Sequence, residues 1–169
     1  GRPHLSEPTS PKGVLIVMPA YNAAQTLEMT HAAIPVGAAG GILLVDDASH
    51  DDTLAVARTL PKVVTHAHPA NRGYGANQKT CYRLALEHGA DIIVMVHPDY
   101  QYTPKLIPAM ASMVANGVHP CVLGSRILGG HALKGGMPWW RYVSNRFLTL
   151  FGNILMSTKL SEFHTGYRA

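Results

Sequence analysis

The sequence is poor in residues that mark several common protein classes. Its 169 residues include two cysteines, and 14% of them are charged. Cys81 and Cys121 lie far apart, so we expect two buried or half-buried thiols in a reducing compartment rather than a disulfide or a zinc site. Hydrophobic residues make up 47% of the chain, which is too many for a disordered protein. The length suits one domain with its own core.

Several catalytic and binding motifs are also missing. There is no H-E-x-x-H metal motif, and residues 124–126 (Gly-Ser-Arg) lack the flanking glycines of a nucleophile elbow. Residues 78–80 (Gln-Lys-Thr) lack the glycine of a Walker motif. The turn at 71–77 is followed by glutamine where a dinucleotide fingerprint has its third glycine, so an NAD-dependent oxidoreductase is only weakly supported. His66 and His68 alternate without a third ligand, and we expect both to be solvated.

The positive charge is concentrated toward the end of the sequence. The net charge is +4, of which residues 123–169 carry +5 and the remainder −1. This distribution predicts a negatively charged partner. We do not expect nucleic acid, because the basic residues are not interleaved with aromatic ones as in a strand-tracking groove. Residues 139–156 are apolar but contain arginines and asparagines, which suits contact with a membrane surface better than a span.

Short apolar runs alternate with helical patterns along the chain. Residues 1–12 are rich in proline and serine, and we predict a flexible leader there. Strands are predicted at 13–18, 41–45, 63–66, 91–96 and 120–123. Helices are predicted at 23–38 (ended early by Pro35), 51–60 (with aspartates in its first turn), 74–88 and 104–115. This alternation predicts an α/β fold, a mostly parallel sheet with helices on both faces.

Unusual polar residues follow each of the first four predicted strands. They are Pro19, Tyr21 and Asn22 after the first strand, Asp46 and Asp47 after the second, Asn71, Gly73 and Asn77 after the third, and His97, Asp99 and Gln101 after the fourth. Ligands of open α/β sheets bind beyond the carboxyl ends of the strands. Four such clusters on one edge therefore predict a binding site.

The chemistry of these clusters favours a nucleotide. A carboxylate at 46 or 47 can accept hydrogen bonds from a base or a ribose, although neighbouring side chains on a strand face opposite sides. Gly73 allows close approach of the backbone at a helix N-terminus. Oxygen ligands at 97–101 suit Mg²⁺ or Mn²⁺ beside a diphosphate. The alternative is that His97 packs and Asp99 caps the next helix.

These motifs together resemble the family 2 glycosyltransferases of the GT-A fold. The branch with dolichyl-phosphate mannose synthase and bacterial polyprenyl-phosphate glycosyltransferases is the most similar. The resemblance runs from Val14 to the end of the chain. It rests on MPAYN (18–22), LLVDDASHDDT (43–53), NRGYGANQKTCYRLA (71–85), HPDYQY (97–102), LGSR (123–126) and TGYR (165–168).

The resemblance implies an enzyme that uses a nucleoside diphosphate sugar and a divalent cation, Mg²⁺ or Mn²⁺. The residues implied to hold the nucleotide are Pro19, Tyr21, Asn22, Asp46, Asp47, Asn71, Gly73 and Asn77. The metal would be held by Asp99, with His97 and Gln101 beside it. His97 stands where the family has an acidic residue, so metal binding should be weaker and more sensitive to pH.

The end of the chain resembles the acceptor side of that branch. Residues 13–169 are expected to form one domain, truncated at its C-terminus, that lies in the cytoplasm or peripherally on the inner face of the membrane. We expect an inverting hexosyltransferase in which Asp99, Arg126 and Arg141 are catalytic and a polyprenyl phosphate is the acceptor, because that phosphate needs no general base. If Glu162 lies at the anomeric carbon, it would be the base for a hydroxyl acceptor. A non-catalytic nucleotide-sugar-binding module is the other alternative.

Overall fold

Four of the five predicted strands form one parallel sheet. The computed structural model describes residues 13–100, 102–124 and 169. The strands are β1 (Val14–Ala20), β2 (Gly41–Asp46), β3 (Val63–Ala67) and β4 (Ile92–Met95). They are hydrogen-bonded in the order β3-β2-β1-β4, and every pairing is parallel.

The two central strands are buried on both faces. All but one residue of each of β1 and β2 are buried, which fits their continuous runs of valine, isoleucine and leucine. In their register Val17 lies opposite Leu43, and Met18 lies opposite Leu44. The edge strand β3 is less covered, and the side chain of Val64 is 56% exposed. The carboxyl ends of β1 and β2 therefore lie in the middle of the sheet, and packing on both faces holds them in place.

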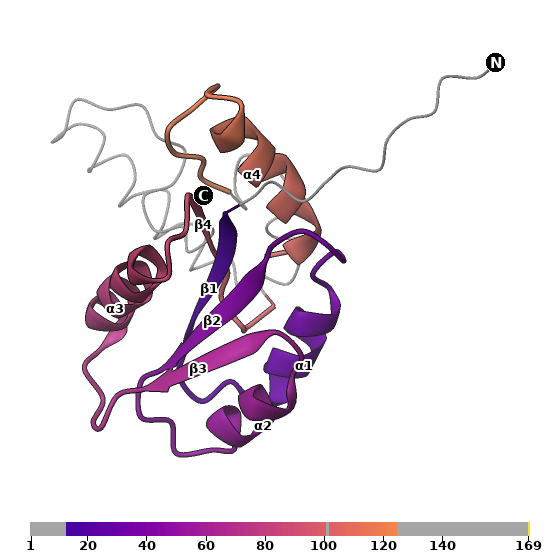
Figure 1. Ribbon diagram of the computed structural model, residues 1–169. Coiled ribbons are helices and arrows are strands. Elements are labelled where there is room, and N and C mark those ends of the chain that lie inside the picture. The colour runs from indigo at the N-terminus through magenta and orange to yellow at the C-terminus, as the bar shows by residue number, and fades with distance from the viewer. Residues whose placement is uncertain (1–12, 101, 125–168) are drawn as a thin grey trace, which may run out of the picture. The chain divides into compact units, whose positions relative to one another are not determined.

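Helices cover both faces of this sheet. They are α1 (Ala24–Ala32), α2 (Thr53–Thr59), α3 (Tyr74–Glu87) and α4 (Ile107–Ala115), which directly follows the 3₁₀ turn η1 (Pro104–Leu106). Figure 1 shows α3 on one side of the strands and α1, α2 and α4 on the other. On the α3 side, Cys81 and Ala85 pack with Val17, Leu43 and Met95 in a buried cluster. The predicted α/β class, with helices on both faces, is confirmed.

Two predictions for these elements are wrong, and one is confirmed. The helix at 23–38, which Pro35 was expected to end early, does end early, at Ala32. The helix expected at 51–60 begins at Thr53, so its first turn contains no acidic residue. No strand forms over residues 120–123, where Val122 instead exchanges two backbone hydrogen bonds, of 2.7 and 2.9 Å, with Ala169.

Asp51, which precedes α2, joins the starts of two helices. Its carboxylate accepts hydrogen bonds from the backbone N–H groups of Thr53 (3.0 Å) and Ala24 (3.1 Å) and from the Thr53 hydroxyl. The unpaired N–H groups at a helix start need such acceptors. Burial raises the pKa of the Asp51 carboxyl, but these hydrogen bonds outweigh burial and hold the pKa below its ordinary value of 3.8.

Several expectations fall on residues outside the described ranges. They concern the leader at 1–12, the apolar segment at 139–156 and the basic residues that follow Gly124. Within the described ranges, no helix has both the length and the hydropathy needed to cross a bilayer.

The two thiols differ in environment. Cys81 is fully buried on α3, and this burial raises the pKa of its thiol to about 12. Cys121 is exposed, so the expectation that both thiols are at least half-buried is wrong for this residue. It lies after α4, the last described helix.

We predict that one thiol reacts in the native protein. At pH 8 Cys81 has almost no thiolate, which is the reactive form, and the reagent cannot reach it. Titration with a chromogenic disulfide should release about one equivalent rapidly from Cys121 and a second only in denaturant. Rapid release of two equivalents from the folded protein would contradict the packing of α3 against the sheet.

Candidate functional site

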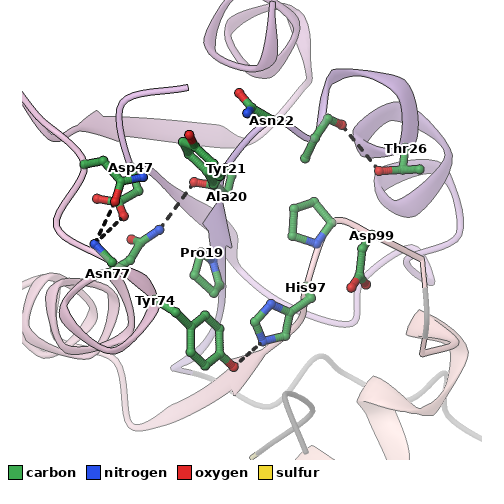
Figure 2. A pocket seen from close by; sticks show the side chains of 14 residues that line it. Pro19, Ala20, Tyr21, Asn22, Thr26, Asp47, Tyr74, Asn77, His97 and Asp99 are labelled. Atoms are coloured by element: carbon green, nitrogen blue, oxygen red, sulfur yellow. Dashed lines mark hydrogen bonds between the residues drawn. The ribbon is translucent and has the colours of Figure 1, made fainter. Parts of the chain in front are cut away.

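A cavity of about 390 Å³ opens beyond the carboxyl ends of the strands. It is built from the ends of β1 and β2, the segment before α3 and the segment after β4 (Figure 2). The lining residues are Pro19, Ala20, Tyr21, Asn22, Ala23, Thr26, Asp47, Asn71, Gly73, Tyr74, Asn77, His97, Pro98 and Asp99. The structure thus brings residues from all four predicted clusters to one place.

The Asp47 side chain accepts three hydrogen bonds in the wall of this cavity. It directly follows β2 and is 2% exposed. Its Oδ1 accepts hydrogen bonds from Nδ1 of His68 (2.7 Å) and from the backbone N–H of Arg72 (2.9 Å). Its Oδ2 accepts one from the backbone N–H of Gly73 (2.9 Å). A carboxylate has about four acceptor positions, so Asp47 retains room for one more donor.

These partners decide the charge state of Asp47. Burial alone would raise the pKa of its carboxyl, but the hydrogen bonds from His68, Arg72 and Gly73 outweigh burial and hold that pKa below its ordinary value of 3.8. A buried carboxylate that is stabilised in this way stays ionised at neutral pH. The cavity therefore has a fixed negative charge in its wall.

His68 is buried rather than solvated, which corrects the expectation from the sequence. The residue is 5% exposed, with Nδ1 hydrogen-bonded to Asp47 (2.7 Å) and Nε2 3.0 Å from the Thr80 hydroxyl. The residue lies one position beyond β3, where its backbone N–H donates to the Asp46 carbonyl. The chain therefore turns this side chain inward beneath α3. His66 is only partly buried.

Asp46 and Asp47 point in different directions. The Asp46 carboxylate accepts from the backbone N–H (3.1 Å) and the hydroxyl (2.5 Å) of Ser49, and it does not line the cavity. The Asn22 side chain also has a partner in the protein, since its Oδ1 accepts a hydrogen bond from the backbone N–H of His50 (2.9 Å). This geometry does not support the expected nucleotide contact of Asp46. The Asp46 carboxylate instead stabilises the turn after β2.

The Asn77 side chain is hydrogen-bonded from α3 to the ends of β1 and β2. Its Nδ2 donates to the carbonyls of Val45 (3.0 Å) and Ala20 (3.4 Å), the second of which is drawn in Figure 2. Its Oδ1 is buried and has no hydrogen-bond partner among the described residues. Gly73, at the start of α3, has φ of 84°, a conformation that side-chain-bearing residues rarely adopt.

His97 and Asp99 follow β4 on the opposite wall from Asp47 (Figure 2). Nε2 of His97 lies 3.0 Å from the Tyr74 hydroxyl, and the two rings stack with centroids 5.3 Å apart. Tyr74 is the first residue of α3, and no role is predicted for it from the sequence. The one signal for it is that Tyr74 and Gln78 lie four residues apart and so share one helix face.

The metal and acceptor predictions are only partly covered by the described residues. No group of three or more His, Cys, Asp or Glu side chains there could hold a metal ion. The carboxylate of Asp99 suits Mg²⁺ or Mn²⁺ if a diphosphate supplies further oxygens, which is how such ions are commonly held. The predicted residues Gln101, Arg126, Arg141 and Glu162 lie outside the described ranges.

The sheet and its cavity define the GT-A fold, as the comparison with solved structures shows. Glucosyl-3-phosphoglycerate synthase of Mycobacterium tuberculosis, solved with Mn²⁺, UDP and glucosyl-3-phosphoglycerate, is similar with a TM-score of 0.50 and 22% identity over 60% of this chain and 39% of that one. S. aureus TarS 1–349, solved with UDP, gives a TM-score of 0.50 and 16% identity over 65% and 34%. At these identities the likeness concerns the fold.

The chain belongs to glycosyl transferase family 2, whose model matches residues 15–168. The UDP-N-acetylglucosamine–dolichyl-phosphate N-acetylglucosaminyltransferase of Methanococcus voltae is 27% identical over 94% of this chain and 69% of its own length. An uncharacterized protein of Methanocaldococcus jannaschii is 26% identical over 92% of this chain. This chain spans 63% of that second relative and about a third of the TarS fragment. The expected family is confirmed.

We predict that Asp47→Asn lowers the free energy of unfolding by about 2–3 kcal/mol at pH 7, because the hydrogen bonds to a buried charged group are lost. Urea denaturation measures the loss. Glu87→Gln is the matched control, since it removes an exposed carboxylate paired with Arg83 and should cost no more than about 0.5 kcal/mol. Equal losses in the two variants would contradict the anchoring role of Asp47.

The same variant should change the acid stability. Because the pKa of Asp47 is lowered in the folded state, its contribution is complete above the ordinary carboxyl value near 3.8 and is lost as the pH falls through the lowered value. The gap between wild type and Asp47→Asn should therefore be constant from pH 7 to 5 and shrink below about pH 4. A gap that grows in acid would contradict this assignment.

Proposed function

We propose that the cavity holds a nucleoside diphosphate sugar and that the chain transfers the hexose to an acceptor with inversion at the anomeric carbon. The observation that carries this proposal is the convergence of four strand-end segments around one cavity in a member of a glycosyltransferase family. Two similar folds were solved with UDP, which supports a nucleotide in this position.

The lining residues suggest a division of roles. The ring of Tyr21, 48% exposed, is available to the base beside Pro19. The remaining acceptor position of Asp47 suits a base N–H or a ribose hydroxyl. Gly73 and Asn71 form the turn before α3, in which Oδ1 of Asn71 accepts from the backbone N–H of Gly73 (3.0 Å), so the backbone there can approach the nucleotide closely.

The diphosphate would lie toward Asp99, on the wall opposite Asp47. A divalent cation, when bound, neutralises charge on the diphosphate that leaves. Asp99 would hold it, with Gln101 as a further oxygen ligand. Placing the diphosphate on this side keeps it away from the buried charge of Asp47, which would repel it.

The proposed acceptor is a polyprenyl phosphate. The Methanococcus voltae relative acts on dolichyl phosphate. In this chain, residues 123–169 carry a net charge of +5, which suits a phosphate at a membrane surface. Arg126 and Arg141 would bind this phosphate through charge-assisted hydrogen bonds. A phosphate oxygen is already ionised at neutral pH, so it can attack the anomeric carbon without a general base. A peripheral position on the cytoplasmic face of the membrane would follow.

A nucleotide panel tests donor binding. At about 100 times its Kd, a nucleoside diphosphate should raise Tm by roughly 5–10 °C, whereas NAD should not. UDP, GDP, CDP and dTDP should be compared with and without Mn²⁺. Tyr21→Ala should abolish most of the shift. Met29→Ala is the matched control, because Met29 is also 48% exposed but does not line the cavity. A shift with NAD alone would overturn the proposal.

Transfer from a labelled donor tests the acceptor. The label should pass to polyprenyl phosphate and not to soluble sugars, and Arg126→Ala and Arg141→Ala should each lower the rate at least tenfold. Exclusive transfer to hydroxyl acceptors, together with loss of activity in Glu162→Gln, would favour the general-base mechanism. Tight nucleotide binding without any transfer would favour a binding module.

A further inference from the structure

The side chain of His97 is held by the first residue of α3. Its Nε2 lies 3.0 Å from the hydroxyl of Tyr74, and its ring stacks on the Tyr74 ring at an interplanar angle of 30°. Figure 2 shows this bond between the segment after β4 and the start of α3. Two contacts, one polar and one aromatic, therefore fix the ring in this orientation.

Gln78 sets the direction of this hydrogen bond. Its Nε2 lies 2.5 Å from the Tyr74 hydroxyl and 3.4 Å from Sδ of Met95. A thioether sulfur can accept but cannot donate, so the amide end that faces Met95 must be the NH₂ group. The same NH₂ group donates to the Tyr74 oxygen, and the hydroxyl proton of Tyr74 is then directed at Nε2 of His97.

This arrangement is incompatible with a metal ion on Nε2. A metal needs the lone pair of a neutral imidazole nitrogen. If Tyr74 donates, that lone pair accepts its proton. If Nε2 carries the proton instead, no lone pair exists there. In the tautomer that Gln78 sets, Nε2 accepts from Tyr74 and Nδ1 carries the ring proton, so neither nitrogen offers a lone pair to a cation.

We propose that Tyr74 and Gln78 lock His97 away from the divalent cation, so that Asp99 is the side-chain ligand on this wall among the described residues. His97 then serves as a hydrogen-bonded wall of the donor cavity rather than as a substitute for a carboxylate ligand. The proposal rests on the proposed donor site. It assigns functions to Tyr74 and Gln78 and replaces the metal-binding role predicted for His97.

Binding of Mn²⁺, followed by loss of the free-ion EPR signal in the presence of UDP, tests the lock. His97→Ala should bind Mn²⁺ within about twofold of wild type, because the imidazole is not a ligand. Tyr74→Phe should bind about tenfold more tightly, because the freed Nε2 can then coordinate. The double variant Tyr74→Phe/His97→Ala should return to the wild-type value, which separates coordination from a general change in the cavity.

Two results would overturn the proposal. A tenfold weaker affinity in His97→Ala would make His97 a ligand in the native protein. An unchanged affinity in Tyr74→Phe would mean that Tyr74 locks nothing. The side chain of Tyr74 is 55% exposed, so removal of its hydroxyl leaves the core intact, and equal thermal melts of the variants check this.

NMR of ¹⁵N-labelled histidine separates failure of the lock from failure of the donor site, since it needs no nucleotide. In the wild type, Nε2 of His97 should show a hydrogen-bonded shift that moves in Tyr74→Phe. His88 is an internal reference, because its Nδ1 bonds to the Leu84 carbonyl (2.7 Å) at the far end of α3. An Nε2 signal that Tyr74→Phe leaves unmoved would overturn the lock even if UDP binds.

Discussion

The cavity depends on the buried carboxylate of Asp47. A carboxylate that is 2% exposed is tolerated only when it is hydrogen-bonded, and the donors to Asp47 come from two segments of the chain. His68 comes from the end of β3, and the backbone N–H groups of Arg72 and Gly73 come from the turn before α3. The hydrogen bonds to the Asp47 carboxylate therefore fix the path of the turn before α3. That turn places the start of α3 beside the sheet.

The position of α3 determines what a ligand meets. Its first turn carries Tyr74, which reaches across to His97, and its second carries Asn77, which is hydrogen-bonded to the carbonyls at the ends of β1 and β2. One wall of the cavity thus has a fixed negative charge, and the opposite wall has a stacked aromatic pair next to Asp99. The parallel sheet supplies a rigid edge, whereas the chemistry comes from residues in the segments that follow the strands.

Much of this arrangement could be predicted from the sequence. The runs of valine, isoleucine and leucine identified β1 and β2, and the rule that ligands bind at the carboxyl ends of parallel strands pointed to the correct edge. The sequence could not decide between Asp46 and Asp47, because the choice depends on the twist at the end of β2. The contacts of His68 depend on the path of the chain after β3, which no local pattern encodes. The apolar run at 120–123 does not form a strand among the described residues, and Val122 there pairs with Ala169, a contact that no local pattern encodes.

Residue-specific mapping of nucleotide binding tests the central claim most directly. In a ¹H–¹⁵N titration of the labelled chain with UDP, the account predicts that the largest amide shifts fall on Tyr21, Asp47, Gly73 and Asn77, with smaller shifts after β4. The apolar groove between Ile34 and Gly41, which also involves Lys62, should remain unaffected. Shifts confined to that groove, or scattered over the surface without the amides around Asp47, would contradict the account.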